Sequence, residues 1–262
     1  MTAYKERYQT DGYLTSIRLL SEQEANHQRT ILEKAESQVG PLHYKTKVHT
    51  LLRPPFEVAT QKNVLDIVEE LIGPDILLYN ANYIIKEPHS KAHVSWHQDL
   101  TYWGFDQDDQ VSMWLALSSA TEQSGCMKML PGSHIQGKQA HHFTEDESNV
   151  LLSGQTIKDV DESKAVVCDL AAGEASFHHG WTMHTSMSNR SDDRRIGLNV
   201  QFIAPHIKQT KGQIDGAILV RGEDKYGYYE TDLVAKVDLS SEAIAYQKQL
   251  EKRYVAIAGT GN

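Results

Sequence analysis

The chain has 262 residues, of which 40% are hydrophobic and 23% charged, a composition typical of a globular protein with a sizeable core. Its net charge of −9 and its lack of a strongly basic run argue against nucleic acid as the main partner, because phosphate binding depends on clustered Lys and Arg. Two cysteines, no apolar N-terminal segment and no long apolar run exclude a disulfide framework, a secretory leader and a membrane span, so we expect a cytoplasmic protein.

Residues 1–75 are predicted to be mainly helical. The segment SEQE, which begins at Ser21, has the spacing of a capping box and predicts a helix that runs toward Gly40. Residues 61–72 place six aliphatic side chains on one broad stripe, and a Gly-Pro pair follows them. We therefore expect a second, amphipathic helix that ends at this pair.

From residue 76 the pattern changes to short segments rich in β-branched and aromatic residues, with glycine-bearing turns between them. The predicted strands cover residues 76–87, 111–120, 165–170, 174–179 and 195–204. Helices followed by many short strands predict a mostly β fold with flanking α-helices, and a double-sheet jelly roll is one closed form of such a fold.

Two segments of the second half differ from this pattern. Residues 135–164, inside the predicted 76–205 core, are polar and carry few strand signals, so we expect a long loop or insert. Residues 206–262 are predicted to be a C-terminal extension. It contains a short helix from Ser240 to about Tyr254, which we expect to pack on the outside of the molecule.

A candidate metal site begins at His97 and Asp99. These residues are two apart, so on an extended strand both side chains would point to the same face. An imidazole and a carboxylate side by side, joined by a second histidine, form the set that binds iron(II) and leaves one face of the metal open. His184 is the favoured second histidine because it follows a turn at a predicted strand start, and His179 is the fallback. On a strand, only one of His178 and His179 can face inward. The inward one could be a metal ligand or simply a buried histidine of the core.

Arg194 and Arg195 stand directly before the last predicted core strand, and alternation lets only one of them point inward. A buried basic group needs an anionic partner. Because arginine can bind a carboxylate through two parallel hydrogen bonds, a small dicarboxylate cosubstrate would supply the anionic partner. A salt bridge to Asp192 or Asp193 is the alternative.

Three motifs follow one another along the chain: HQD with an aromatic-rich segment after it, SGCMKMLPGSH at 124–134, and GEASFHHGWTMHTSMSNRSDDRRIGL at 173–198. In this order they resemble the phytanoyl-CoA dioxygenase family of iron(II)/2-oxoglutarate-dependent oxygenases. The resemblance is closest over residues 76–205 and implies one oxygenase domain with a double-stranded β-helix core, a cupin-like jelly roll. The eleven-residue interval from His184 to Arg195 also matches the family, whereas Arg194 would give ten.

The resemblance implies that His97, Asp99 and His184 hold iron(II) and form the catalytic centre. It implies 2-oxoglutarate and O2 as cosubstrates, hydroxylation of an unactivated C–H bond, and release of succinate and CO2. The carboxylate of Asp99 disfavours halogenation, because the halogenating branch carries Gly or Ala at this position. The residues that the resemblance places at or near 2-oxoglutarate are Arg195, Ser186, Gln98 and Trp114.

The substrate is less well defined by the sequence. Lys45, Lys47 and His49 alternate, so on an extended segment they would share one face and form a cationic wall, unless they only protect a solvated edge. The aromatic residues expected around the substrate are Tyr102, Trp103 and Trp181. We expect a small anionic or zwitterionic metabolite, such as an amino acid, a betaine, a phosphonate or a natural-product intermediate. The alternatives are a non-catalytic metal- or ligand-binding protein on the same fold and a cupin-type metalloenzyme that does not use 2-oxoglutarate.

Overall fold

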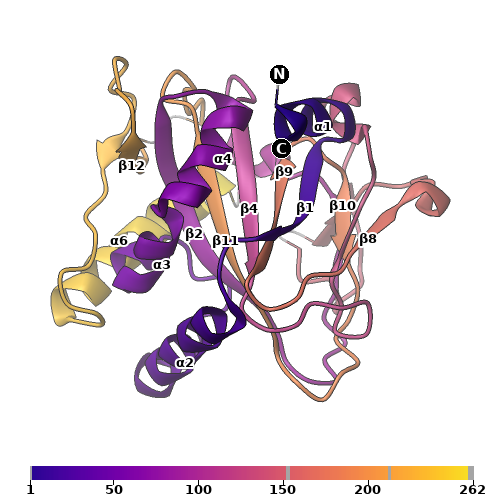
Figure 1. Cartoon of the computed structure of the whole chain (residues 1–262), viewed down its shortest axis with the longest axis horizontal. Coiled ribbons are helices and arrows are strands. Elements are labelled where there is room, and N and C mark those ends of the chain that lie inside the picture. Colours follow the sequence, from indigo (N-terminus) through magenta and orange to yellow (C-terminus); the bar gives the residue numbers. More distant parts are fainter. Residues whose placement is uncertain (1, 152–153, 212–213, 259–262) are drawn as a thin grey trace.

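Two β-sheets face each other in the computed structural model, which describes residues 2–151, 154–211 and 214–258 (Figure 1). The larger sheet has the order β1 (Tyr13–Arg18), β9 (Glu174–His179), β4 (Gln110–Ala116), β11 (Arg195–Ile203), β2 (Ile76–Lys86), β12 (Gly216–Arg221) and β13 (Glu230–Thr231). The smaller sheet has the order β3 (Val94–His97), β10 (His184–Ser186), β5 (Met127–Met129) and β8 (Val166–Cys168). All strand pairs in both sheets are antiparallel except β12 with β13.

The helices are α1 (Ala3–Asp11), α2 (Glu22–Val39), α3 (Arg53–Ala59), α4 (Lys62–Ile72), α5 (Leu100–Trp103) and α6 (Ser241–Ala258). The two predicted N-terminal helices are confirmed. The hydroxyl of Ser21 accepts a hydrogen bond from the backbone of Glu24, whose carboxylate accepts one from the backbone of Ser21, so the capping box is complete. Helix α4 ends at Gly73, as predicted.

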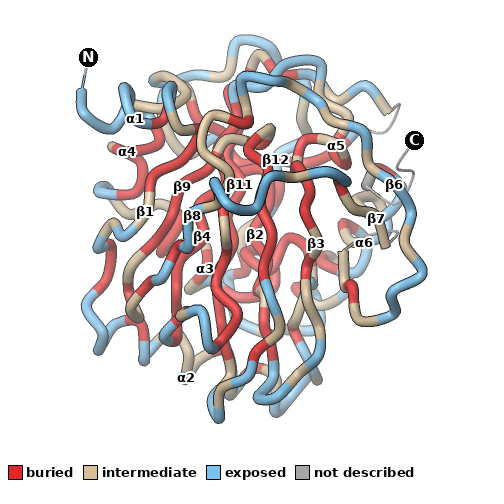
Figure 2. Tube along the Cα trace, turned by 90° about the vertical axis from the view of Figure 1, so that its right-hand side faces the viewer, coloured by how far each residue is buried: buried red, intermediate tan, exposed pale blue. Residues whose placement is uncertain are grey.

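The central strands of the larger sheet, β9, β4, β11 and β2, are buried on both faces, and the two faces carry different residues. In β11, Leu198 and Val200 belong to the main hydrophobic core together with residues of α4 such as Val68. The residues that alternate with them, among them Asn199 and Gln201, line a cavity between the sheets. Figure 1 shows α3 and α4 on the outer side of this sheet, and Figure 2 shows its strands buried along most of their length. One face therefore stabilises the fold and the other forms the floor of the cavity.

Three parts of the chain differ from the prediction. The mainly helical N-terminal region contains β1, which pairs with β9 at the edge of the larger sheet. The insert at 135–164 contains β6 (His142–Phe143) and β7 (Gln155–Thr156), which pair with each other. The C-terminal extension adds β12 and β13 to the larger sheet. These strands are short or lie at sheet edges, where the alternation of polar and apolar residues is weak.

The predicted C-terminal helix is present, but it is longer than expected and one of its sides is buried. Helix α6 continues to Ala258, and its residues Leu250 and Ile257 are buried. Tyr254 lines the cavity, and its hydroxyl accepts a hydrogen bond of 3.0 Å from the indole nitrogen of Trp103. In the part of the chain that the structure describes, no helix combines the length and the apolar character needed to cross a membrane.

Candidate active site

His97, Asp99 and His184 meet at the inner side of the smaller sheet. His97 ends β3, His184 begins β10, and the two residues are direct partners in the antiparallel pair, with ring centroids 4.0 Å apart. Their Nε2 atoms lie 3.4 and 3.6 Å from Oδ1 of Asp99. The spacing of His97 and Asp99 suggested that both lie on one strand, but Asp99 does not. The chain turns after His97, and Asp99 occupies the N-cap position of α5 with helical dihedral angles. The three predicted ligands therefore converge by a turn rather than by strand alternation.

The donor set fits a divalent metal. Nδ1 of His97 hydrogen-bonds the carbonyl oxygen of Ser95 at 2.8 Å, and Nδ1 of His184 hydrogen-bonds that of Thr182 at 3.0 Å. Because a carbonyl only accepts, each Nδ1 carries the proton and each Nε2 keeps a free lone pair. Burial, followed by the neighbouring His97, lowers the pKa of His184 well below its ordinary value, which keeps this imidazole neutral.

Asp99 is held through its second oxygen. Oδ2 accepts a hydrogen bond from the hydroxyl of Ser112 at 3.1 Å and hydrogen-bonds Nε2 of His178 at 3.2 Å. These two hydrogen bonds to Oδ2 favour the ionised form of the buried carboxylate. Asp99 is thus an ionised carboxylate whose Oδ1 points toward the two histidine ligands.

His178 and His179 point to opposite faces of β9, as alternation predicts. His178 is buried beside Asp99, with ring centroid 4.6 Å from that of His184, and its Nδ1 makes no hydrogen bond with any described residue. His179 lies on the other face near Tyr8 and Asp108, away from the metal-binding residues. The structure therefore brings His178 into the site and leaves the fallback ligand His179 outside it.

At the opposite end of the cavity lies Arg195, which is 1% exposed. Its Nε and Nη2 atoms make no hydrogen bond with any described residue, and burial lowers its pKa to about 10, so it remains cationic at neutral pH. The guanidinium lies 5.1 Å from the ring centroid of Trp114. Trp114 packs against Gly197, where a Cβ atom would lie 2.0 Å from the indole. A buried cation with free donors fits an anionic ligand.

Lys86 is a residue at this end that sequence reasoning missed. It pairs directly with Arg195 across β2 and β11, and its Nζ donates to the hydroxyl of Ser186 at 2.8 Å. Burial, followed by the positive charge of Arg195, lowers the pKa of Lys86 to about 6. Ser186 lines the cavity. The sequence did contain a signal for Lys86, because it is a basic residue at the end of the apolar strand 76–86. As with Arg195, a basic side chain buried at such a position needs polar partners.

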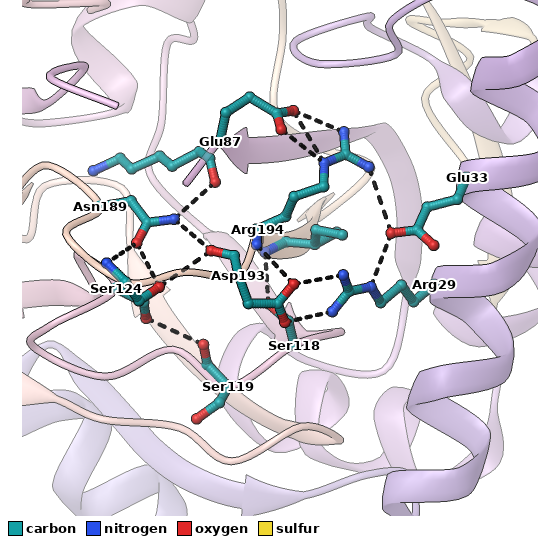
Figure 3. A network of polar contacts seen from close by, with 12 residues as sticks. Arg29, Glu33, Glu87, Ser118, Ser119, Ser124, Asn189, Asp193 and Arg194 are labelled. Carbon is teal, nitrogen blue, oxygen red and sulfur yellow. Dashed lines mark hydrogen bonds and ion pairs between the residues drawn. The ribbon is translucent and has the colours of Figure 1, made fainter. Parts of the chain in front are cut away.

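Arg194 points out of the cavity, which decides between the two arginines. It forms ion pairs with Glu87 and Glu36, both at 2.9 Å, and Figure 3 shows it in the polar network at the start of β11. In the same network the guanidinium of Arg29 donates two hydrogen bonds of 2.7 Å to Asp193 (Figure 3). Helix α2 is thereby tied to the turn before β11, which fixes the position from which Arg195 enters the cavity.

A model of the phytanoyl-CoA dioxygenase (PhyH) family matches residues 8–197. The chain belongs to the phytanoyl-CoA dioxygenase family. It is 30% identical over 164 residues to the human peroxisomal phytanoyl-CoA dioxygenase, covering 60% of this chain and 48% of that protein. It is 28% identical over 177 residues to a probable alpha-ketoglutarate-dependent hypophosphite dioxygenase of Stutzerimonas stutzeri, covering 66% and 58%. The chain thus spans about half the length of these curated relatives.

Solved structures confirm the fold. The non-heme monooxygenase ThoJ, in its apo form, superposes with a TM-score of 0.84 at 29% identity, over 96% of this chain and 95% of that one. CytC3 with Fe(II) and alpha-ketoglutarate shares the fold, with a TM-score of 0.67 at 20% identity, over 92% and 98%. The predicted family and the predicted jelly-roll core are both confirmed.

In this member of the family, the cavity has a volume of about 280 Å³. Tyr102, Trp103 and Trp114 line it, as expected, and Val150 and Leu151 show that the 135–164 insert contributes to its wall. The cavity is lined by Tyr44, Thr46, Asn80, Asn82, Ile84, Val94, His97, Asp99, Tyr102, Trp103, Trp114, Met127, Val150, Leu151, His178, His184, Thr185, Ser186, Arg195, Asn199, Gln201 and Tyr254.

Gln98 and Trp181 are not among the lining residues. The side-chain amide of Gln98 donates to the carbonyl oxygens of Gly137 and Trp181, at 2.9 and 2.7 Å, and accepts from the backbone of Gln139. Gln98 therefore ties the insert to the loop before β10. Trp181 packs beside the cluster of Leu100, Tyr102 and Trp103, behind the cavity wall.

The expectation that Lys45, Lys47 and His49 share one face of an extended segment is wrong. Lys47 has a positive φ of 56°, and a 3-10 helix, Val48–Thr50, follows it. Lys47 is fully buried behind the cavity, where its Nζ lies 3.0 Å from a carboxylate oxygen of Asp232, and His49 lies beside the same carboxylate. Lys45 pairs with Glu251 at 3.6 Å. None of the three lines the cavity, because the turn at Lys47 directs Tyr44 and Thr46 toward it instead.

Proposed function

We propose that this chain is an Fe(II)- and 2-oxoglutarate-dependent oxygenase that hydroxylates an unactivated C–H bond of a small molecule. Its cofactors are Fe(II), 2-oxoglutarate and O2. The observation that carries the proposal is the presence, in one cavity, of the cluster His97, Asp99 and His184 and of the buried Arg195 with two unpaired donors. Of the described residues, only this cluster brings three metal-ligating side chains together.

Each group has a role in this reaction. His97, Asp99 and His184 would hold the metal through two imidazoles and one carboxylate, a ligand set that leaves room for 2-oxoglutarate and O2 to bind. When bound, these cofactors supply the oxidation, in which 2-oxoglutarate and O2 yield succinate and CO2 and one oxygen atom enters the substrate C–H bond. Arg195 and Ser186 bind the distal carboxylate of 2-oxoglutarate. Hydroxylation is favoured over halogenation because Asp99 keeps its position as a ligand.

The anionic or zwitterionic substrate class is not part of this proposal. Lys45, Lys47 and His49, which could have formed a cationic wall for such a substrate, lie outside the cavity. Among the described residues that line the cavity, Arg195 is the only Lys or Arg. Since 2-oxoglutarate would pair with Arg195, no Lys or Arg among these lining residues remains to pair with an anionic substrate.

The proposal is tested by measuring succinate formation from 2-oxoglutarate, first without and then with mixtures of small metabolites. We expect succinate only when both Fe(II) and O2 are present, and none with Asp99→Ala. An Arg194→Met variant is a matched control for Arg195→Met, because it removes the neighbouring guanidinium outside the cavity. Succinate formation that persists in Asp99→Ala, or that needs no iron, would contradict the proposal.

A further inference from the structure

Four carboxamide side chains form one end of the cavity floor. Asn80 and Asn82 project from β2, Asn199 and Gln201 project from β11, and all four are buried and line the cavity. They are paired in register, Asn199 with Asn82 and Gln201 with Asn80. We call these four residues the amide subsite. Buried amides among apolar strands need hydrogen-bond partners, so their unpaired atoms are informative.

Part of the hydrogen-bonding capacity of the amide subsite is unused. Oδ1 of Asn80 accepts from the hydroxyl of Thr46 and the backbone of Lys47, both at 2.7 Å, which leaves its amino group. The amino group of Asn199 donates to Oδ1 of Asn82 at 3.3 Å. The side-chain oxygen of Asn199 and the amino group of Asn82 therefore remain available to a ligand. Oε1 of Gln201 is buried and makes no hydrogen bond with any described residue. The subsite thus offers both donors and acceptors.

The amide subsite lies beside the metal-binding residues and away from Arg195. Gln201 is the direct partner of Ser112 in β4, and the hydroxyl of Ser112 donates to Asp99. Ser112 is in turn the partner of His178 in β9. Arg195 lies six residues earlier on β11 than Gln201, with Trp114 opposite the intervening Asn199. A group held by Gln201 and Asn80 would therefore lie next to the metal, at the end that 2-oxoglutarate does not need.

The amide subsite has no charged neighbour that could pair with a substrate. Asp99 is the only acidic residue among the described lining residues, and Arg195 is the only Lys or Arg. Lys47 lies behind Asn80, but its ammonium group is already paired with Asp232 and donates to the carbonyl oxygens of Tyr79 and Gly216. Burying a substrate charge here would be costly. Tyr102, whose buried hydroxyl makes no hydrogen bond with any described residue, adds a further neutral group.

We infer that the amide subsite selects an uncharged substrate, by hydrogen bonds to a neutral polar group such as a carboxamide, a peptide bond or a hydroxyl. The apolar body of the substrate packs against Tyr102, Trp103 and Tyr254, which line the same cavity. The reaction of this substrate rests on the proposed function, whereas the preference of the amide subsite for an uncharged group does not. Gln201 is its central residue, because its Oε1 is buried at the cavity and makes no hydrogen bond with any described residue.

The test compares three isosteric probes that differ in charge: benzamide, benzoate and benzamidinium. Their affinities are measured by calorimetry under anaerobic conditions with Fe(II) and saturating 2-oxoglutarate, so that benzoate cannot occupy the site at Arg195. We expect benzamide to bind at least about tenfold more tightly than either ion. Gln201→Leu is expected to weaken benzamide binding about tenfold, the effect of one well-formed hydrogen bond. Gln201→Glu is expected to shift the preference toward benzamidinium.

Equal or tighter binding of either ion to the wild-type protein would overturn the inference, as would absence of benzamide binding up to its solubility limit. Unchanged benzamide affinity in a folded Gln201→Leu variant would also overturn it. The comparison among the three probes does not depend on any variant. Titration of the metal-free protein with Fe(II) and then with 2-oxoglutarate separates the two proposals, because failure to bind either one refutes the oxygenase function. In that case Arg195 stays open to benzoate, and the comparison of benzamide with benzamidinium alone reports on the amide subsite.

Discussion

His184 and His97 are direct partners across the antiparallel strands β10 and β3, with ring centroids 4.0 Å apart, although they are 87 positions apart in the chain. This pairing brings the two proposed histidine ligands together, because each ring is anchored by a backbone carbonyl through Nδ1 and presents Nε2 toward Asp99. The register of the smaller sheet therefore determines how His97 and His184 lie relative to each other.

His178 is predicted to be a positioning residue for Asp99, the proposed carboxylate ligand. His178→Phe removes the hydrogen bond to Oδ2. We expect the affinity for Fe(II) to fall about 10- to 100-fold, as is typical when a residue that hydrogen-bonds a metal ligand is lost. His178→Gln, which keeps a donor, is expected to recover part of the loss. The measurement is anaerobic competition with a chelator. His179→Phe, on the other face of β9, is the matched control, and wild-type affinity in a folded His178→Phe variant would refute this role.

Arg195→Met is predicted to weaken 2-oxoglutarate binding by roughly 2–5 kcal/mol, because it leaves the buried distal carboxylate without its partner. Arg194→Met should leave the affinity within a few-fold of the wild type, since Arg194 pairs with Glu87 and Glu36 outside the cavity. Calorimetric titration with 2-oxoglutarate in the presence of a redox-inert divalent metal measures both. If the two variants lose affinity equally, Arg195 is not the carboxylate-binding residue.

Lys86 is predicted to make stability depend on pH. Its pKa is lowered from 10.5 to about 6 in the folded protein, so between these values the unfolded chain binds a proton that the folded chain lacks. The free energy of unfolding should therefore rise with pH by up to about 1.4 kcal/mol per unit in this window. Lys86→Met removes this contribution, so its stability relative to the wild type should be greatest near pH 6 and decline toward alkaline pH.

Urea denaturation of the metal-free wild type and of Lys86→Met, at pH values from about 6 to about 9, measures this difference. Groups other than Lys86 titrate equally in both proteins, so they cancel in the comparison. A stability difference that stays constant over the range would show that Lys86 keeps its ordinary pKa in the folded protein.

Lys47→Met is predicted to destabilise the fold by about 3–5 kcal/mol, because it leaves the buried carboxylate of Asp232 without its cation. Lys45→Met is the matched control: its ion pair with Glu251 is partly exposed, and its loss should cost less than about 1 kcal/mol. Thermal or urea unfolding measures both. Equal, small effects would mean that the buried ion pair does not hold the C-terminal extension to the rest of the fold.

Much of this architecture could be predicted from local patterns. The capping box at Ser21, the aliphatic stripe of 62–72 and the β-branched runs of β2 and β11 depend on residues close in sequence, which is why their positions were correct within one or two residues. Motif order and spacing predicted His97, Asp99 and His184 as ligands and chose Arg195 over Arg194, and the structure places all four predicted residues on one cavity. The structure adds what no spacing reveals, namely that Asp99 reaches the site from a helix N-cap position.

The residues that were missed depend on long-range packing. Nothing near Lys47 in the sequence shows that Asp232, 185 positions away, will neutralise it. Likewise, the pairing of β12 with β2 and the hydrogen bond between Tyr254 and Trp103 join the C-terminal extension to residues far away in the sequence. A usable signal did exist for the amide subsite: Asn80 and Asn82, like Asn199 and Gln201, alternate within apolar strands and so occupy one face. Such paired polar positions in buried strands indicate a cavity wall.

The most direct test of the central claim is anaerobic titration of the metal-free protein with Fe(II) and then 2-oxoglutarate, followed by visible absorption. We predict a weak charge-transfer band when both are bound, absent with either alone and absent in Asp99→Ala. Its appearance would show that 2-oxoglutarate chelates the iron held by His97, Asp99 and His184. Tight iron binding with no band at saturating 2-oxoglutarate would contradict the account.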